Sequence, residues 1–166
     1  EFFEITRFNL SGITLEYGTV NMTRMLEQLT YEFKPMLLDK SLGCRLDAEP
    51  DIMVECDADK MQRVLDNLLR NAVNYSYENT TIKVEAGVSG KDVRIKVINE
   101  GNTIPAEKLE RIFEQFFRLD TARSSRSGGA GLGLAIAREI VQLHHGKISA
   151  ESTNGITCFE VVIPVS

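Results

Sequence analysis

The strongest constraint on the fold is a long amphipathic helix, which the sequence predicts over residues 57–76. Apolar side chains recur in it at intervals of three and four residues, the spacing of a helix with one face in a core. They are Met61, Val64, Leu65, Leu68, Leu69, Ala72 and Val73. Asp57 stands at the start of this segment and is expected to cap the helix. The apolar face must therefore pack against another layer of the molecule.

The polar side of the same helix carries a row of amides. Asn67 and Asn71 are four residues apart and Asn74 follows three later, so they project from nearly the same side. Tyr75 lies beside them. Asparagine is a middling helix former, so three on one stripe call for a reason. They form either a solvated face or a row of neutral oxygens and N–H donors facing a polar ligand. In the second case an amide oxygen is able to ligate a hard cation such as magnesium.

Length, charge and cysteine content exclude several classes of protein. With 166 residues, the chain is long enough for one well-buried domain and too short for two. The net charge is -5, and no basic stripe dominates the sequence. Both observations argue against a nucleic-acid partner. Cys44, Cys56 and Cys158 are odd in number, widely spaced and without a paired motif. We therefore expect reduced thiols in a cytosolic setting and no metal cluster.

The chain offers no segment that we expect to cross a membrane. Its most apolar stretch near the C-terminus, residues 132–143, contains Arg138 and Glu139 and is too short to span a bilayer. The sequence begins at Glu1 without a signal peptide and is typical of the middle of a protein. A membrane attachment is therefore expected only through an N-terminal part of a parent protein.

Short helices and strands are predicted on both sides of the long helix. Before it, we expect an edge strand over 14–20, a helix over 22–39 that breaks at Pro35, and two short strands over 44–48 and 52–56. The turn between the two strands is Glu-Pro-Asp.

After the long helix, residues 81–88 and 93–99 alternate apolar and polar side chains on either side of a short turn, which predicts a hairpin. Two more alternating strands are predicted over 147–152 and 157–163.

The pattern loosens over residues 100–130, apart from a short helix-like piece around 109–113. A loop of this length in a compact domain is usually functional, and we interpret it as a lid. It contains Arg118 and ends in a cluster of glycines, from which a helix predicted over 132–145 begins directly. Free backbone N–H groups and the positive end of a helix dipole would suit phosphate there. Glycine-rich turns are often only flexible connections, so the arginines strengthen this interpretation.

Four motifs together resemble the sensor histidine kinases. Asn67 to Asn71 with Ala72 resembles the N box, Asn99, Gly101, Ile104 and Pro105 the first glycine box, residues 113–118 the F box, and Gly129, Gly131, Leu132, Gly133 and Leu134 the second glycine box. The order and spacing match the family over about residues 20–164, which is far more specific than any one motif. Residues 5–10, 118–125 and 128–137 are most similar to the vancomycin-resistance sensor kinases of the VanS type.

The resemblance implies an α+β two-layer sandwich with a Bergerat-type ATP-binding fold. A mixed β-sheet would pack against about three helices, and a flexible lid would cover the ATP. Residues 1–12 would be the remnant of a preceding dimerisation helix and its linker. Residues 13–166 would be the catalytic ATP-binding domain.

The resemblance also implies ATP and Mg²⁺ as ligands and suggests a role for each motif residue. Asn71 would ligate magnesium, Asn67 would contact phosphate or metal-bound water, and Asn99 would read the adenine amino group. Arg118 would meet the terminal phosphate, where planar donors suit developing negative charge, so the catalytic candidates are Asn67 and Arg118. The other nucleotide contacts implied are Asn74, Tyr75, Gly101, Ile104, Gly129, Gly131, Leu132, Gly133, Leu134 and Thr157.

The chain departs from the family pattern at four positions. Asn99 stands where aspartate is usual, Thr103 replaces the second glycine of its box, and Asn74 replaces a lysine. Ile156 stands where a late glycine is common, with Gly155 displaced by one residue. An amide oxygen still accepts a hydrogen bond from adenine, but the charge is gone and the amide is able to flip, so we expect weaker adenine discrimination.

The resemblance leaves three functions open. A histidine kinase phosphorylates a histidine on a separate dimerisation domain and passes the phosphoryl group to a cognate response regulator. His144 and His145 lie at the end of a predicted helix, where we expect structural roles. The favoured function is therefore the catalytic half of a kinase, in the cytoplasmic part of a bacterial membrane sensor.

The alternatives are an ATPase like the gyrase, Hsp90 and MutL group, and a module that binds ATP without transferring it. Those ATPases carry a glutamate at the position of Asn67, where an amide cannot take a proton from water.

Overall fold

The computed structural model describes residues 13–115, 117 and 133–166, and its longest helix is the predicted one, α4 (Ala58–Tyr75). The Asp57 side chain caps α4 by accepting a hydrogen bond from the backbone N–H of Lys60 at 3.0 Å. All seven apolar side chains that the spacing singled out are buried. The predicted helix, its cap and its core-facing side are therefore confirmed.

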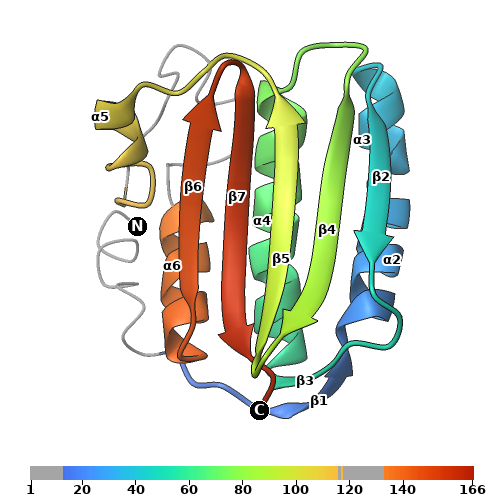
Figure 1. Ribbon diagram of the computed structural model, residues 1–166, viewed down its shortest axis with the longest axis vertical. Coiled ribbons are helices and arrows are strands. Elements are labelled where there is room, and N and C mark those ends of the chain that lie inside the picture. Colours follow the sequence, from blue (N-terminus) through green and yellow to red (C-terminus); the bar gives the residue numbers. More distant parts are fainter. Residues whose placement is uncertain (1–12, 116, 118–132) are drawn as a thin grey trace, which may run out of the picture.

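A mixed five-stranded sheet forms the layer on which α4 packs (Figure 1). Its strands lie in the order β2 (Gly43–Ala48), β4 (Thr81–Ser89), β5 (Asp92–Glu100), β7 (Ile156–Pro164) and β6 (Lys147–Thr153). Strand β2 pairs in parallel with β4, and every other pair is antiparallel. The predicted hairpin is confirmed: β4 and β5 pair up to Ser89 and Asp92, and Gly90 in the turn has a φ of 63°.

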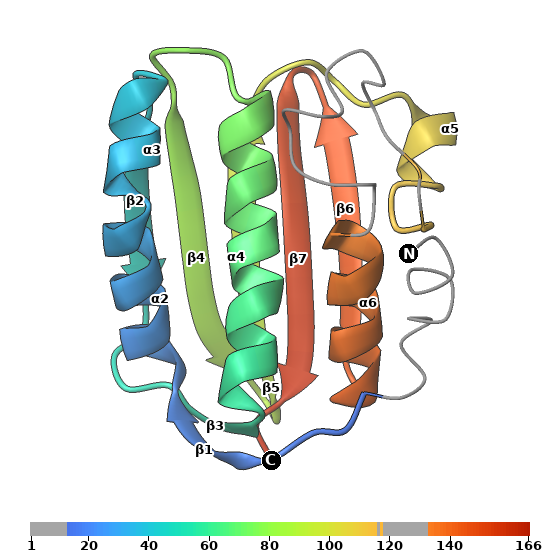
Figure 2. The ribbon, with the colours of Figure 1, turned by 180° about the vertical axis from the view of Figure 1, so that it is seen from behind.

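The helices cover one face of this sheet, so the molecule has the two layers that were predicted (Figure 2). They are α2 (Met22–Glu32), α3 (Lys34–Asp39), α4 and α6 (Gly133–Leu143). A fifth helix, α5 (Ala106–Leu109), stands beside β6 at the edge of the sheet. The "about three helices" of the prediction are the long ones, α2, α4 and α6. The break between α2 and α3 lies at Phe33, and Pro35 occupies the first turn of α3.

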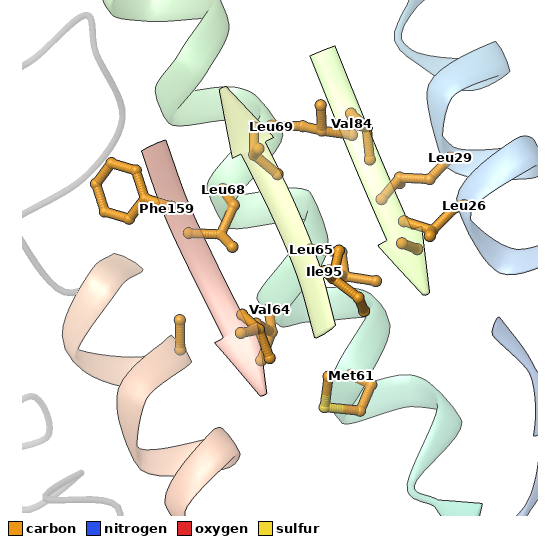
Figure 3. Packing of buried hydrophobic residues seen from close by; sticks show 14 of the residues in the cluster. Leu26, Leu29, Met61, Val64, Leu65, Leu68, Leu69, Val84, Ile95 and Phe159 are labelled. Carbon is orange, nitrogen blue, oxygen red and sulfur yellow. The ribbon is translucent and has the colours of Figure 1, made fainter. Parts of the chain in front are cut away.

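The core fills the space between α4 and strands β4, β5 and β7. Figure 3 shows Leu65 of α4 near Ile95, and Leu68 near Phe159. All four side chains are at most 3% exposed. Fully burying a side chain of this size contributes roughly 1.5–3 kcal/mol, so α4 is held firmly against the sheet. This packing also fixes the position of the polar side of α4 relative to the sheet.

Two predictions of local structure need correction. The strands expected over 44–48 and 52–56 are confirmed as β2 and β3 (Met53–Cys56), which belong to different sheets. The corrections concern the strand before them and the short helix after β5. Strand β3 pairs with β1 (Gly18–Asn21) in a small antiparallel sheet, so the edge strand predicted over 14–20 starts only at Gly18 and ends at Asn21. The helix-like piece around 109–113 is also misplaced: α5 ends at Leu109 and turns follow, because Pro105 starts the helix early.

Strands β6 and β7 and helix α6 lie within a few residues of the predicted ranges. None of the described helices is both long enough and apolar enough to cross a bilayer. Residues 118–132 lie outside the described part of the chain, and they include the end of the predicted lid, residues 118–130.

Candidate functional site

A cavity of about 340 Å³ opens where α4 ends, at the β5–α5 loop and the β6–β7 turn. Its volume falls within the range of roughly 300–1,000 Å³ that is typical of small-molecule sites. The described residues that line it are Asn71, Tyr75, Asn99, Asn102, Thr103, Ile104, Pro105, Lys108 and Thr157. Lys108 is the one charged side chain among them, so the described lining is mostly neutral and polar.

Two buried polar side chains from neighbouring strands lie side by side in this lining. Asn99 of β5 and Thr157 of β7 are direct partners in the sheet, and each side chain is only 4% exposed. No described residue forms a hydrogen bond with the Asn99 amide, and no fully buried polar atom of the described residues lacks a partner. The Asn99 amide is therefore accessible from the cavity, where a ligand is able to satisfy it.

A short hydrogen-bonded chain holds the Thr157 hydroxyl. Its Oγ1 lies 2.8 Å from Oγ of Ser152, and either oxygen is able to donate. The Ser152 hydroxyl in turn accepts the backbone N–H of Ile104 at 2.8 Å. This chain links the β6–β7 pair to the loop after β5. It positions Thr157 and Ile104 on one wall of the cavity.

The amides of α4 separate into two environments. Asn71 and Tyr75 are half-buried and line the cavity. Asn67, one turn earlier, donates from Nδ2 to the carbonyl oxygen of Gly133 at 2.9 Å, where α6 begins. Asn74 is not among the residues that line the cavity, and its backbone carbonyl accepts a hydrogen bond from Nζ of Lys40 at 3.2 Å. The lysine therefore stabilises the negative end of the α4 dipole.

Gly101 allows the chain to pass close to the end of α4. A Cβ atom at this position would lie 2.2 Å from the backbone oxygen of Tyr75, closer than atoms of neighbouring residues approach. The N–H of Gly101 donates to the carbonyl of Gly155 at 2.9 Å. Gly101 therefore brings the loop after β5 against both α4 and the β6–β7 turn.

Two of the departures from the family pattern meet in the structure. The Thr103 hydroxyl accepts a hydrogen bond from the backbone N–H of Gly155 at 2.6 Å. Gly155 has a φ of 80°, a conformation that favours glycine, and the exposed Ile156 follows it. The residue that replaced a glycine and the displaced glycine are thus bonded to each other. This contact fastens the loop that carries Ile104 to the tip of the β6–β7 hairpin.

No group of described His, Cys, Asp and Glu side chains is arranged to hold a metal ion. A magnesium ion at this site would therefore rely on the Asn71 oxygen together with oxygens of a bound ligand. This fits the ion, which is commonly held by one or two protein oxygens plus substrate phosphates and water.

The structure brings together some of the predicted site residues and leaves others apart. Asn71, Tyr75, Asn99, Ile104 and Thr157 line one cavity, with Gly101 directly behind it. Gly133 lies against Asn67, whereas the half-buried Leu134 packs against the core. The predicted residues outside the described part of the chain are Arg118, Gly129, Gly131 and Leu132.

Four polar residues of this region, Asn102, Thr103, Lys108 and Ser152, had not been predicted as site residues. Asn102 and Lys108 line the cavity, and Ser152 supports Thr157. The pairing of the last two strands was the only available signal for Ser152, because it places Ser152 opposite Thr157.

The two histidines lie outside the cavity lining. His144 is 2% exposed, its Nε2 accepts the backbone N–H of Asp57 at 3.0 Å, and its Nδ1 lies 2.8 Å from the carbonyl oxygen of Ile140. Because Nε2 accepts, Nδ1 is the ring nitrogen that is placed to donate to this carbonyl. His145 is exposed and has a φ of 65° just after α6. His144 therefore has the structural role that was expected.

The chain belongs to the family of histidine kinase-, DNA gyrase B- and HSP90-like ATPases, whose family model matches residues 56–166. That range contains all the described residues that line the cavity. The sensor protein VanSC of Enterococcus gallinarum is 45% identical to this chain over 164 residues, which are 99% of this chain and 45% of the relative. The sensor protein VanS of Enterococcus faecium is 49% identical over 164 residues, 99% of this chain and 42% of the relative. The chain thus spans less than half the length of these relatives.

The fold matches the catalytic domain of histidine kinase ThkA in a nucleotide-free form. The TM-score is 0.82 at 31% identity, over 91% of this chain and 97% of that domain. ThkA in complex with the response regulator protein TrrA matches with a TM-score of 0.81 at 28% identity, over 99% of this chain and 47% of that one. The predicted α+β fold of a histidine kinase catalytic domain is confirmed.

Proposed function

We propose that this chain is the ATP-binding catalytic domain of a two-component sensor histidine kinase that acts in vancomycin-resistance signalling. It transfers the γ-phosphate of Mg-ATP to a histidine on a dimerisation domain. The observation that carries this proposal is the cavity itself, where the buried Asn99 and Thr157 side chains lie a short distance from the helix amides. Family membership and the similarity to VanS-type sensors support it.

The purine base occupies the cavity beside Asn99. The amide oxygen accepts from the exocyclic amino group of adenine, and the Thr157 hydroxyl supplies a second hydrogen bond to the base. Ile104 and Tyr75 cover the faces of the ring. Gly101 supports this wall from behind, because it lets the loop after β5 approach the end of α4 closely. A few well-placed polar groups that fix the orientation of the ligand are typical of such sites.

The triphosphate extends along the amide row of α4 toward the start of α6. Asn71 holds magnesium through its amide oxygen, and the ion supplies charge neutralisation for the phosphates. Asn67 contacts phosphate or metal-bound water, from a position beside Gly133. Asn74, Arg118, Gly129, Gly131, Leu132 and Leu134 complete the proposed phosphate and lid contacts.

The chemistry of Asn67 favours transfer to histidine over hydrolysis. An amide has no lone pair basic enough to take a proton from water, so a bound ATP lacks a general base at this position. General-base catalysis is typically worth about a hundredfold to ten-thousandfold in rate, so ATP is held intact until an acceptor arrives. Arg118 stabilises the charge on the moving phosphoryl group.

The partners follow from this role. The acceptor histidine lies on the dimerisation domain of the parent kinase. The phosphoryl group passes on to a cognate response regulator, the kind of partner that ThkA has in its complex with TrrA. The domain works on the cytoplasmic side of the cell membrane, to which the N-terminal part of the parent attaches it.

Nucleotide binding is tested by titration calorimetry with ATP in the presence and absence of Mg²⁺. Asn71→Ala should weaken binding with Mg²⁺ at least roughly tenfold, the effect that even an indirect metal contact has, and little without the ion. Gln62→Ala, at an exposed position of α4, should bind like wild type. Equal affinities for wild type and Asn71→Ala under both conditions would remove Asn71 from the metal site. Absence of ATP binding by wild type would contradict the proposed function itself.

A further inference from the structure

The cavity presents two polar groups whose donor and acceptor directions are not set by the protein. The Asn99 side chain carries an amide oxygen and an amide N–H₂ that differ little in shape. It is 4% exposed, faces the cavity, and forms no hydrogen bond with any described residue. Both orientations of the amide therefore leave the rest of the site unchanged. A carboxylate at this position would only accept.

The Thr157 hydroxyl is also able to present either a donor or an acceptor to a ligand. Its hydroxyl shares one hydrogen bond with the Ser152 hydroxyl, and either oxygen is able to donate. The Ser152 oxygen already accepts the Ile104 N–H and still has a lone pair and a proton to offer. When Ser152 donates, the Thr157 proton is free for a ligand. When Thr157 donates, its remaining lone pair is free to accept.

Purine bases differ at the position that such groups recognise. Adenine presents an amino donor at carbon 6 and an acceptor at ring nitrogen 1. A 6-oxopurine, such as hypoxanthine or guanine, presents an acceptor at carbon 6 and a donor at nitrogen 1. One amide orientation pairs with the first edge and the flipped orientation pairs with the second. The number of hydrogen bonds is the same in both cases.

From these contacts we infer that Asn99 and Thr157 make the site a general purine nucleotide site, which binds 6-oxopurine triphosphates as well as ATP. This inference rests on the proposed nucleotide-binding function and specifies its substrate class. Discrimination by a polar site arises when a buried group is left unpaired by the wrong ligand. Here both side chains reverse their hydrogen bonding together, so neither purine leaves Asn99 or Thr157 unpaired. The site therefore accepts both kinds of purine because residue 99 is an amide, which is able to flip, and not a carboxylate, which only accepts.

The inference is tested by calorimetry of ATP and ITP with Mg²⁺, because ITP changes the atoms at carbon 6 and nitrogen 1 without adding the 2-amino group of GTP. The wild-type dissociation constants should agree within roughly tenfold, because an intact set of hydrogen bonds is kept. Asn99→Asp should retain ATP and increase the preference for ATP over ITP by roughly 10- to 100-fold, because a carboxylate facing the 6-oxo group leaves both unpaired. Asn102→Asp adds the same charge to the lining, where Asn102 already accepts from the Tyr77 hydroxyl at 2.6 Å. That variant should keep the wild-type ratio.

A second variant keeps the test decisive if Asn99→Asp does not fold. Thr157→Val removes the rotating hydroxyl without changing the shape of the side chain, so it should weaken ATP and ITP by the same factor. A wild-type protein that binds ATP more than roughly tenfold more tightly than ITP would overturn the inference and leave the proposed function intact. An unchanged ratio in a folded Asn99→Asp, or a tenfold change of ratio in Thr157→Val, would also overturn it. If wild type bound neither nucleotide, the proposed function would fail.

Discussion

The hydroxyl of Thr103 and the backbone N–H of Gly155 form a 2.6 Å hydrogen bond between segments that lie 52 residues apart in the chain. One partner belongs to the loop that lines the cavity, and the other forms the tip of the β6–β7 hairpin. The carbonyl of the same Gly155 accepts the N–H of Gly101 at 2.9 Å. These two bonds hold the loop after β5 against the hairpin tip, beside the cavity that Asn99 and Thr157 line.

The first prediction concerns this contact. Thr103→Val keeps the shape of the side chain but leaves the Gly155 N–H without its acceptor, so ATP should bind roughly 2- to 12-fold more weakly, the cost of one net hydrogen bond. Thr103→Ser keeps the hydroxyl and should bind like wild type. Hydrogen exchange of the Gly155 amide, followed by NMR, should quicken in the valine variant only. Unchanged exchange and affinity in Thr103→Val would show that the contact does not position the loop.

The second prediction concerns the close approach at Gly101. Gly101→Ala places a methyl group 2.2 Å from the Tyr75 carbonyl oxygen, so the loop or the end of α4 must move. We expect a loss of about 1–3 kcal/mol in the free energy of unfolding, together with weaker ATP binding. Denaturant unfolding measures the first and calorimetry the second. Gly18→Ala is the matched control, because a Cβ there meets nothing within 4 Å. If both variants proved equally stable, the close approach would not constrain the site.

The third prediction concerns acid stability at the far end of α4. Burial alone would raise the pKa of Asp57, but the backbone N–H groups of Glu16 and Lys60 donate to its carboxylate, and together with the nearby positive charge of Lys60 they hold the pKa below its usual value of 3.8. The folded state therefore binds this proton less readily than the unfolded state. The stabilisation is present above about pH 4 and is lost as the pH falls through the lowered pKa.

Asp57→Asn should accordingly lower the free energy of unfolding by about 1–2 kcal/mol at pH 7, because one oxygen cannot replace two charged acceptors. The difference from wild type should shrink below pH 4, where the wild-type carboxyl also gains a proton. Urea unfolding at pH 7, 5, 4 and 3 measures it. Asp59→Asn, in the first turn of the same helix, should cost less, about 0.3–1 kcal/mol. A difference for Asp57→Asn that stays constant from pH 7 to pH 3 would contradict the assigned pKa shift.

Much of the fold was predictable because local spacing and tertiary packing agree. The apolar residues of α4 recur with the helical period and are all buried, and the strands of the sheet alternate as their burial does. The exception is the strand before α4. Nothing in the local pattern separates β2 from β3, and only the parallel pairing of β2 with β4 places them in different sheets.

The candidate site was predictable where the motifs supply the cavity lining directly. Asn71, Asn99 and Thr157 lie on different elements, yet they line one cavity. The Thr103–Gly155 bond was not predictable, because it depends on how a hairpin tip approaches a loop. The Ser152 support follows only from the pairing of the last two strands, which places Ser152 opposite Thr157. In the sequence, Thr103 and Ile156 are two separate positions where a glycine is missing. In the structure, Thr103 is hydrogen-bonded to Gly155, the glycine that is displaced from position 156.

Radiolabel transfer tests whether the chain passes the γ-phosphate of ATP to a histidine on another domain. The protein is mixed with γ-labelled ATP, Mg²⁺ and a separately made dimerisation domain of a VanS-type kinase, with Asn71→Ala as the control. We predict acid-labile label on the histidine of the added domain, none on His144 or His145, and near-background phosphate release when the acceptor is left out. Rapid phosphate release by the chain alone, with no label on the acceptor, would contradict the kinase function and identify an ATPase.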